Sequence, residues 1–594
     1  MTGVDSGASV AAARADSGDR SDERAGIAVW PATAQLRPGD PLEVVVDGEA
    51  GSPVGLRVLE GTTAVAGVEV PPAPAGIRAS GGPRRVTLRL PGGAPRAAYA
   101  IEAQAASGAR ATSAVDVAPH WWTAPRYGFL SDFAPDEAAT ESTRRADALL
   151  RLHVNVVQFY DWMASHHTFL SPSPEFTDPL GRRLSHTVVR RKIDLLHARG
   201  TAALAYGAVY GAEADFSREH PDWLLYDGRG EPLSLAETFY LQDFAPPSPW
   251  RGWILDQYDA AVAALGFDGI HVDQYGFPKH ARSRAGGAWH TVDLSAQLPG
   301  FVAEAAERVR RRRPEGGVIF NCVNAWPLES LAGLRDDAAT YIEVWEPHTR
   351  FRDLYELVRR ARMLRPGMSV ILAAYLRPFH PDQRRDPGAL TALRLTSAAI
   401  GASGGFSLLL GEGDGVLADP YYPRYGRLDR HEAQVVRRYA DFAVRNTTRL
   451  HDPSPTDIAW THVGPANGVI TLHHAALESY GAGAVPGSLW VIGRRAGTET
   501  ILQLVNLRGL ATDAWNAEQP SGPTPLTELE VRVRIVGGVA GVWWDTPDDD
   551  AGTGRALAFD VTDTAEGRFL VFRVPRIDVW SCAWWRESDE TDLP

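Results

Sequence analysis

Between residues 121 and 450 the chain alternates short apolar segments with helical stretches, and this alternation limits the possible folds more than any other feature. Eight apolar segments have the character of buried β-strands, and they begin near residues 127, 154, 202, 266, 317, 340, 369 and 405. Clear helical patterns lie between them at residues 187–199, 250–265 and 297–313. Eight strand–helix units over about 330 residues predict a (β/α)8 TIM barrel with enlarged loops.

Short strands separated by Gly- and Pro-rich turns flank this region on both sides. Residues 27–120 predict an N-terminal immunoglobulin-like β-sandwich, and residues 451–594 predict a C-terminal antiparallel β-sandwich. Residues 1–26 are rich in Ala, Ser, Gly, Asp and Arg, which predicts a disordered tail. The expected chain is therefore multidomain, with a catalytic barrel over residues 121–450 between two sandwiches.

Charge and composition disfavour some classes of function. The net charge of the 594 residues is −13, which argues against nucleic acid or an anionic membrane as a partner. No segment reaches the roughly 18 apolar residues that span a bilayer, and the N-terminus lacks the apolar run of a signal peptide. The expected location is the cytoplasm, or outside the cell if a leader has been removed. The oligomeric state is not predicted.

The two cysteines, Cys322 and Cys582, are far apart in the sequence. Cys322 lies in an apolar strand segment, and no pair of Cys-x-x-Cys elements is present to hold zinc. We therefore expect both cysteines to be free, buried thiols.

Two of the predicted barrel strands end in a carboxylate. Residues 266–276 read as a buried strand that presents Asp273 at its C-terminal end, where barrel enzymes carry out their chemistry. Residues 340–347 present Glu343 in the same way. The two strands are the fourth and the sixth, next-nearest neighbours, so the carboxylates could lie about 5–5.5 Å apart, as in retaining glycosidases.

Two nearby carboxylates are weaker candidates for catalysis. Asp268 precedes the inward-facing part of its strand and is expected to be a turn residue. Glu346 lies beyond the strand, directly before Pro347, and is expected at the rim of the site. Asp273 and Glu343 therefore remain the predicted catalytic pair.

Aromatic, amide and imidazole side chains near the ends of the predicted strands suit the binding of a sugar, because rings stack on sugar faces and polar groups bind hydroxyls. The predicted substrate-binding residues are Tyr160, Asp161, Trp162, His166, His271, Gln274, Asn321, Asn324 and Trp345. The loop over residues 212–250 contains further aromatic residues and could set a preference for substrate length.

Adjacent histidines, His166 and His167, raise the alternative of a metal site. The first predicted strand does not end in a His-x-His pair, and metal-dependent barrels usually need several spaced ligands. We therefore predict no metal and no other cofactor, which makes a metal-dependent hydrolase the weakest of the alternatives.

These motifs together resemble glycoside hydrolase family 66, the dextranases and cycloisomaltooligosaccharide glucanotransferases. The resemblance rests on residues 158–163 with His166 and His167, on residues 266–276 and on residues 341–345. It covers the barrel, and the order sandwich–barrel–sandwich agrees with it. It implies that Asp273 is the nucleophile, that Glu343 is the general acid/base, and that the substrate is an α-1,6-linked glucan such as dextran or isomaltooligosaccharides.

The chain departs from the resemblance in two respects. Members that make cyclic products look to carry an extra carbohydrate-binding module within the catalytic region, and the predicted barrel has no room for one, which favours hydrolysis over cyclisation. The absence of a signal peptide is unusual for a polymer-degrading enzyme, which favours short, imported oligosaccharides. The alternatives are a transglycosylase that forms cyclic or linear isomaltooligosaccharides, a hydrolase of another α-glycan, and a non-catalytic glycan-binding protein.

Overall fold

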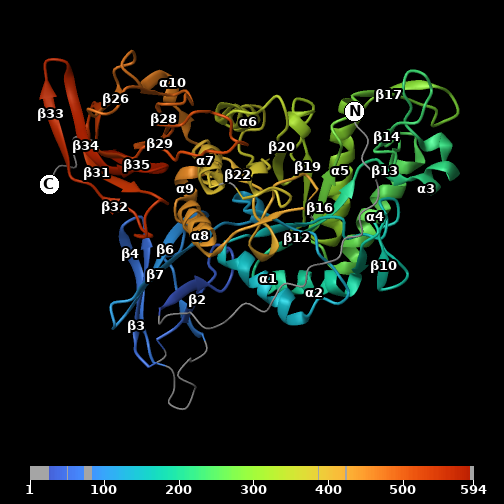
Figure 1. Ribbon diagram of the computed structural model, residues 1–594, viewed down its shortest axis with the longest axis horizontal. Helices are drawn as coiled ribbons and strands as arrows, with labels where there is room; N and C mark the ends of the chain where they lie inside the picture. The colour runs from blue at the N-terminus through green and yellow to red at the C-terminus, as the bar shows by residue number, and fades with distance from the viewer. Residues whose placement is uncertain (1–25, 50, 73–82, 386, 422–423, 589–594) are drawn as a thin grey trace.

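The computed structural model describes residues 26–49, 51–72, 83–385, 387–421 and 424–588. Figure 1 shows a barrel with one β-rich part in blue, formed by the N-terminal region, and a second in red, formed by the C-terminal region. The predicted disordered tail lies outside the described residues, except for Gly26.

The centre of the molecule is the predicted parallel barrel. Its eight-stranded sheet has the order β22-β21-β20-β19-β16-β12-β9-β8 in the described part of the chain. The strands are β8 (Tyr127–Leu130), β9 (Val156–Phe159), β12 (Ala202–Ala208), β16 (Gly269–Asp273), β19 (Gly317–Asn321), β20 (Ala339–Glu343), β21 (Val370–Ala373) and β22 (Phe406–Ser407). A parallel bridge between Phe129 and Gly411 connects β8 to the segment after β22 and closes the ring. The prediction of a TIM barrel is confirmed.

Helices lie between the barrel strands along the chain, and the last three of them follow the final barrel strand. They are α1 (Ala139–Arg151), α2 (His186–His197), α3 (Ala214–Glu219), α4 (Pro249–Leu265), α5 (Leu294–Arg312), α6 (Phe351–Leu364), α7 (Ala389–Ala402), α8 (Arg430–Arg445), α9 (Thr447–Leu450) and α10 (Ala459–His462). Helix α4 shows how the sequence sets these bounds. Ser248 caps its start by accepting from the backbone of Trp250, and Gly266 ends it with a left-handed φ of 88°, which glycine adopts without strain.

Strand β16 alternates between the two sides of the barrel wall, as its sequence predicts. Ile270 and Val272 are fully buried in the core between strands and helices. Gly269 lies on the opposite face, where a Cβ atom would be only 1.7 Å from the carbonyl oxygen of Gly317. The same alternation directs His271 and Asp273 toward the barrel interior and its mouth.

The N-terminal sandwich has two antiparallel sheets around a shared core. One sheet has the order β1-β2-β5 and the other β4-β3-β6-β7. The strands are β1 (Ala28–Pro31), β2 (Leu42–Asp47), β3 (Val54–Glu60), β4 (Thr63–Val70), β5 (Arg84–Leu88), β6 (Ala97–Ala105) and β7 (Arg110–Val117). If these strands are lettered A, B, C, C′, E, F and G, the sheets are A-B-E and C′-C-F-G, an immunoglobulin-like order.

The C-terminal sandwich packs two sheets around a second core. One sheet has the order β25-β28-β29-β35-β31-β32, with β27 paired to β28, and the other has the order β26-β30-β34-β33. The strands are β25 (Thr456–Asp457), β26 (Ile470–His473), β27 (Tyr480–Gly481), β28 (Leu489–Ala496), β29 (Glu499–Asn506), β30 (Leu526–Ile535), β31 (Gly538–Asp545), β32 (Arg555–Ala556), β33 (Phe559–Thr564), β34 (Gly567–Ile577) and β35 (Trp580–Ser588). The prediction of an antiparallel sandwich is confirmed.

Short strands in the loops of the barrel form small sheets of their own. They are β10 (Glu175–Thr177), β11 (Arg183–Ser185), β13 (Gly211–Glu213), β14 (Ser234–Leu235), β15 (Phe239–Leu241), β17 (His280–Ser283), β18 (His290–Asp293), β23 (Gly415–Val416) and β24 (Gly426–Arg427). These insertions are the enlarged loops that the sequence predicts.

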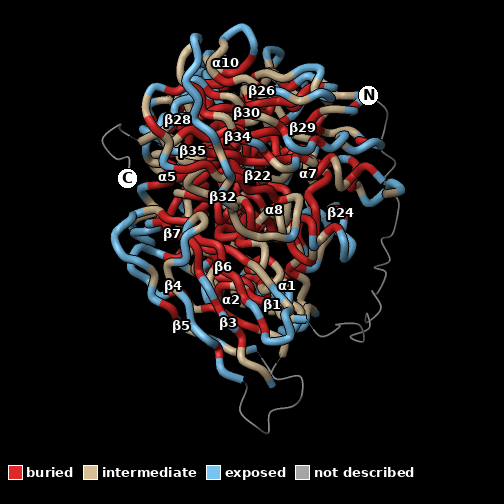
Figure 2. Tube along the Cα trace, turned by 90° about the vertical axis from the view of Figure 1, so that its left-hand side faces the viewer, coloured by how far each residue is buried: buried red, intermediate tan, exposed pale blue. Residues whose placement is uncertain are grey.

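Helices of the barrel join it to both sandwiches. Helix α8 packs against β6 and β7, and α7 packs against β29. Figure 2 shows both sandwiches beside α7 and α8, with buried chain running through the junction. A buried ion pair between Arg445 of α8 and Asp545 of β31, at 2.8 Å, crosses one of these interfaces.

Two further predictions concern the cysteines and membrane-spanning segments. Cys322 and Cys582 are both free and buried, as predicted. In the part of the chain that the structure describes, no helix combines the length and apolar character needed to cross a bilayer.

Candidate active site

The candidate active site lies where neighbouring strands end at the mouth of the barrel. Asp273 is the last residue of β16 and Glu343 is the last residue of β20. Between them β19 pairs with both strands and ends at Asn321. Because the three strands are parallel, their carboxyl ends meet at one mouth. The structure therefore brings two carboxylates and one amide together.

Asn321 connects the two carboxylates through a single nitrogen atom. Its Nδ2 donates to Oδ1 of Asp273 at 2.7 Å and to Oε2 of Glu343 at 3.0 Å. The hydroxyl of Tyr206 donates to Oδ2 of Asp273 at 2.8 Å, and the hydroxyl of Tyr375 donates to Oε1 of Glu343. Each carboxylate oxygen therefore has a donor, and both side chains are held in fixed orientations.

The protein around the two carboxyl groups favours their neutral forms. Burial, followed by the nearby charge of Glu343, raises the pKa of Asp273 to about 7. Burial also raises the pKa of Glu343. Hydrogen bonds from Asn321 and the tyrosines oppose these shifts by stabilising the charged forms. The pair therefore retains a proton near neutral pH and titrates as a unit.

The carboxylates face a cavity of about 590 Å³. The predicted binding residues that line it are Tyr160, Asp161, His166, His271, Gln274, Asn321 and Trp345. Phe239, from the loop over residues 212–250, also lines the cavity, and its ring stacks on His166 with centroids 4.2 Å apart. Aromatic faces and polar groups thus surround the two carboxylates.

Several buried polar atoms in this lining have no protein hydrogen-bond partner within the described residues. They are Oε1 of Gln158, Oδ1 of Asp161, Nδ1 of His166, the hydroxyl of Tyr275 and Oδ1 of Asn321. Buried polar groups are nearly always hydrogen-bonded in proteins. In this cavity these atoms are available to form hydrogen bonds with a polar ligand.

Asp161 enters the cavity from a turn with unusual backbone geometry. Its φ is 47°, in the left-handed region that aspartate tolerates better than most residues. Arg182 holds the turn, since its Nη2 donates to the carbonyl of Asp161 at 2.9 Å. Burial alone would lower the pKa of His166, but Asp161 and other nearby carboxylates outweigh it, so its pKa is raised. His166 and Asp161 therefore form a polar wall of the cavity.

Two predicted binding residues line the cavity but direct their polar atoms into the protein. The Nδ1 atom of His271 is hydrogen-bonded to the hydroxyl of Tyr127 at 2.7 Å, and burial lowers the pKa of His271 to about 3. The amide of Gln274 donates to the carbonyl of Asn321 at 3.1 Å and accepts from the backbone of Gly276 at 2.6 Å. These side chains form the floor of the site and hold its shape.

Trp162 was predicted to bind substrate, and this prediction is wrong. The residue is 0% exposed, and its indole donates to the backbone carbonyl of Tyr206 at 3.2 Å. The left-handed turn at Asp161 breaks the alternation of the strand, so the next side chain enters the core. The structure also places Asn324 outside the cavity lining, where its amide binds the backbone of Trp345 and Glu346, at 2.7 Å each.

Tyr206 and Tyr375, which contact Asp273 and Glu343, are not among the site residues predicted from the sequence. A signal for Tyr375 was present, because Ile371, Ala373 and Tyr375 alternate along one face and all lie in the barrel interior. Tyr206 had a similar signal, since it lies opposite His271 in the register of β12 and β16. The alternation of side chains along the strands points both tyrosines inward at the strand ends, and this pattern identifies them.

Asp268 and Glu346, the two weaker candidates for catalysis, lie away from Asp273 and Glu343. Asp268 lies before β16, where its Oδ2 is hydrogen-bonded to His197 at 2.7 Å and accepts from the backbone of Ala203 at 2.8 Å. Glu346 is exposed beyond β20. Neither lines the cavity.

The adjacent histidines diverge. His167 binds Glu213 through Nδ1, whereas His166 faces Asp161 with Nε2 3.7 Å from Oδ1. In the described parts of the chain, no three His, Cys, Asp or Glu side chains group in a way that could hold a metal ion.

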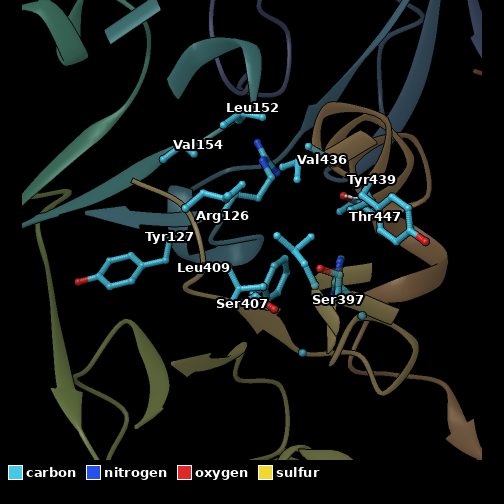
Figure 3. Close-up of a pocket in the computed structure, with 18 of the residues that line it drawn as sticks. Arg126, Tyr127, Leu152, Val154, Ser397, Ser407, Leu409, Val436, Tyr439 and Thr447 are labelled. Carbon is cyan, nitrogen blue, oxygen red and sulfur yellow. Dashed lines mark hydrogen bonds between the residues drawn. The ribbon is translucent and has the colours of Figure 1, made fainter. Parts of the chain in front are cut away.

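A second cavity, of about 140 Å³, lies between β8, β22 and the helices α7 and α8 (Figure 3). Most of its lining is apolar, with Leu152, Val154 and Leu409 among the residues. Figure 3 shows the hydroxyl of Tyr127 directed away from the other labelled side chains, consistent with its bond to His271. This cavity contains no carboxylate and is a gap in packing at the seam where the barrel closes.

Asn321→Ala is expected to move the pH dependence of the site upward. The amide stabilises the ionised form of both carboxyls, so its removal raises both apparent pKa values. A hydrogen bond to a charged group contributes about 1.5–3 kcal/mol, which corresponds to an upward shift of about 1 pH unit or more. The measurement is kcat/KM against pH on an oligosaccharide substrate, and an unmoved profile would contradict the bridging role.

Asp273→Asn is expected to stabilise the folded protein at alkaline pH. The pKa of Asp273 is about 7 in the folded protein and 3.8 in an unfolded chain, so between these values only the folded state keeps the proton. Stability therefore falls as pH rises through this window and stays lower above it. We expect the variant to melt about 2 °C or more above the wild type at about pH 8, with a smaller gain at about pH 5. Calorimetry at both pH values measures this, and no gain at the higher pH would contradict it.

Comparisons with known proteins agree with the fold and with the motifs. The model of glycosyl hydrolase family 66 matches residues 94–583. A cycloisomaltooligosaccharide glucanotransferase of Niallia circulans is 21% identical over 635 aligned positions, which cover 82% of this chain and 64% of the relative. Another protein of that name and organism is 27% identical over 297 positions, covering 47% of this chain and 30% of the relative. The chain thus spans less than two thirds of the curated relatives it matches.

A solved structure shows the same architecture. It is a cycloisomaltooligosaccharide glucanotransferase from Paenibacillus sp., in complex with cycloisomaltoheptaose, with a TM-score of 0.82. The match covers 94% of this chain and 99% of the other at 20% identity, so it supports the fold. Because the family model matches most of the chain, the protein belongs to glycosyl hydrolase family 66.

Proposed function

We propose that the protein is a retaining glycoside hydrolase that cleaves α-1,6-glucosidic linkages in isomaltooligosaccharides or dextran. The main observation behind this proposal is the pair of Asp273 and Glu343, bridged by Asn321 in one cavity. The hydrogens of a planar amide nitrogen diverge by about 120°, so the two accepting oxygens lie about 5 Å apart. That separation fits the roughly 5–5.5 Å of retaining enzymes and leaves no room for the water that an inverting enzyme places between its carboxyls.

The proposed reaction is a double displacement. Ionised Asp273 attacks the anomeric carbon, and protonated Glu343 donates its proton to the leaving glycosidic oxygen. Glu343, now ionised, takes a proton from water, which attacks the anomeric carbon and releases Asp273. The raised pKa values of the pair supply the single proton that the first step needs. Hydrogen bonds from Tyr206 and Asn321 stabilise the leaving carboxylate of Asp273 in the second step.

The substrate class follows from the cavity and from the relatives. The buried polar atoms without protein partners suit the hydroxyls of a glucose unit, and the rings of Tyr160 and Trp345 offer faces for stacking. The curated relatives are glucanotransferases named for cycloisomaltooligosaccharides. These observations favour an α-1,6-glucan over other glycans.

Transglycosylation is the second candidate, because the relatives are named as glucanotransferases. The alignment with one relative spans 635 positions, more than the 594 residues of this chain, although it covers only 82% of the chain. That relative therefore has segments in the matched region that this chain lacks. We propose that hydrolysis predominates here.

Product analysis tests the proposal and separates the two candidates. Isomaltooligosaccharides of defined length and dextran are incubated with the enzyme at low and high concentration, and the products are resolved by mass spectrometry. Hydrolysis gives only products shorter than the substrate. Longer or cyclic products at low concentration would favour the transferase, and no turnover of either substrate would contradict the α-1,6 specificity. The Glu343→Gln variant serves as the inactive reference.

A further inference from the structure

A segment of the C-terminal sandwich reaches the mouth of the barrel. Residues 507–525, which we call the strap, connect β29 to β30. The strap pairs with the loop between β20 and α6: the backbone N–H of Phe351 donates to the carbonyl of Asp513 at 2.9 Å, and that of Trp515 donates to the carbonyl of Thr349 at 3.1 Å. The strap therefore joins the segment that follows Glu343 through one antiparallel bridge, between Ala514 and Arg350.

Two side chains of the strap fix this contact. Trp515 is 3% exposed, and its indole nitrogen donates to the backbone carbonyl of His348 at 2.8 Å. The adjacent Asn516 accepts from the backbone N–H of Arg377 through Oδ1 at 2.7 Å. His348 lies in the loop after β20, and Arg377 lies in the loop after β21. Neighbouring residues of the strap thus hold two separate catalytic loops.

These two loops carry the side chains that surround Glu343. Trp345 lies three residues before His348, and Tyr375 lies two residues before Arg377. Tyr375 donates to Oε1 of Glu343, and the rings of Tyr375 and Trp345 meet edge to face with centroids 5.5 Å apart. A shift of either loop would therefore move a direct neighbour of the carboxyl group.

We propose that Trp515 and Asn516 are positioning residues, which hold the loops after β20 and β21 so that Glu343 is aimed at the leaving oxygen. This inference rests on the proposed role of Glu343 as the acid. Proton transfer needs hydrogen-bond contact between the acid and the leaving oxygen, and a displacement of about 1 Å can cost about 100-fold in rate. Asp273 lies on β16 and its donor Tyr206 on β12, away from the loops that the strap holds. Loss of the strap contacts should therefore impair acid catalysis more than nucleophilic attack.

Two substrates with different leaving groups separate these effects. Cleavage of isomaltotriose needs a proton on the departing sugar, whereas fluoride leaves α-isomaltosyl fluoride without protonation. For each substrate kcat/KM reports the glycosylation step. We expect Trp515→Phe and Asn516→Ala to lower kcat/KM on isomaltotriose by about 10-fold or more, and on the fluoride by less than about 2-fold. Asn516→Ala removes one acceptor from a half-buried side chain, so it serves if Trp515→Phe does not fold.

Trp585→Phe is the matched control. Trp585 is 1% exposed in the core of the C-terminal sandwich, and within the described residues its indole nitrogen has no hydrogen-bond partner. The same substitution in the same sandwich should lower stability without changing the ratio of the two kcat/KM values. Glu343→Gln sets the upper limit of the effect, because we expect it to lose activity on isomaltotriose and to retain activity on the fluoride.

The possible outcomes are distinct. A selective loss on isomaltotriose in the strap variants, absent in Trp585→Phe, supports the inference. Suppose that Glu343→Gln loses activity only on isomaltotriose, as an acid mutant should. Equal losses on both substrates in both strap variants, or no loss in either, would then overturn the inference. If Glu343→Gln itself loses both substrates equally, the proposed role of Glu343 fails, and the inference fails with it.

Discussion

Asp273→Gly is expected to abolish turnover of isomaltooligosaccharides, with kcat reduced on the order of 10⁴-fold or more, because the covalent step loses its nucleophile. Sodium azide should restore turnover, since the small anion can occupy the position of the carboxylate beside Tyr206 and Asn321. Azide then attacks from the face that Asp273 uses, so the product is a β-glycosyl azide with inverted configuration. Initial rates with and without azide, with the product anomer identified by NMR, measure both effects.

Asp268 offers a matched control on the same segment of chain. Its carboxylate lies before β16, at the end of the strand opposite Asp273, and is hydrogen-bonded to His197 and to the backbone of Ala203. Asp268→Asn should keep turnover within a few-fold of the wild type. Near-normal turnover by Asp273→Gly without azide would contradict the assignment of the nucleophile.

Glu343→Gly is expected to lower kcat on isomaltooligosaccharides by about 10²–10⁴-fold, the usual contribution of general acid–base catalysis. Azide should instead restore turnover of α-isomaltosyl fluoride, whose fluoride departs without protonation, and the product should have the opposite stereochemistry. In this variant azide attacks the glycosyl intermediate held by Asp273, so the product is an α-glycosyl azide. The alkaline limb of the pH profile should also disappear, because the group that must remain protonated is absent.

The stereochemistry of the azide product distinguishes the two roles. Glu346→Gln is the control, because Glu346 is exposed three residues beyond Glu343 and does not line the cavity. It should keep near-normal turnover. A β-azide from the Glu343 variant and an α-azide from the Asp273 variant would mean that the two roles are exchanged.

Much of the fold follows from local patterns in the sequence. Helix α4 is predicted at residues 250–265 and observed at Pro249–Leu265, since an apolar stripe ends at a glycine with left-handed geometry. The eighth strand is predicted to begin near residue 405, but only the two residues of β22, Phe406–Ser407, have strand geometry. A strand needs a partner, and at this seam the described chain offers one bridge, between Phe129 and Gly411. Pairing across the closing seam depends on tertiary contacts that a local pattern does not contain.

The sequence predicts the site residues where side chains alternate regularly along a strand, and it misses them where this alternation breaks. Regular alternation of side chains places Asp273 and Glu343 at the mouth of the barrel, and the structure brings them together as the sequence indicates. After β9 the left-handed turn at Asp161 breaks the alternation, which is why Trp162 lies in the core. The bridging bonds of Asn321 and the contacts of Trp515 join segments far apart in the sequence, so no spacing rule could reveal them.

The initial anomeric configuration of the product tests the proposed function most directly. Dextran and isomaltooligosaccharides are hydrolysed in an NMR tube, and the anomeric signals are followed before mutarotation. If Asp273 and Glu343 carry out a double displacement on α-1,6-glucans, the first sugar released has the α configuration. A product that first appears in the β configuration would show a single displacement and contradict the roles assigned to both carboxylates.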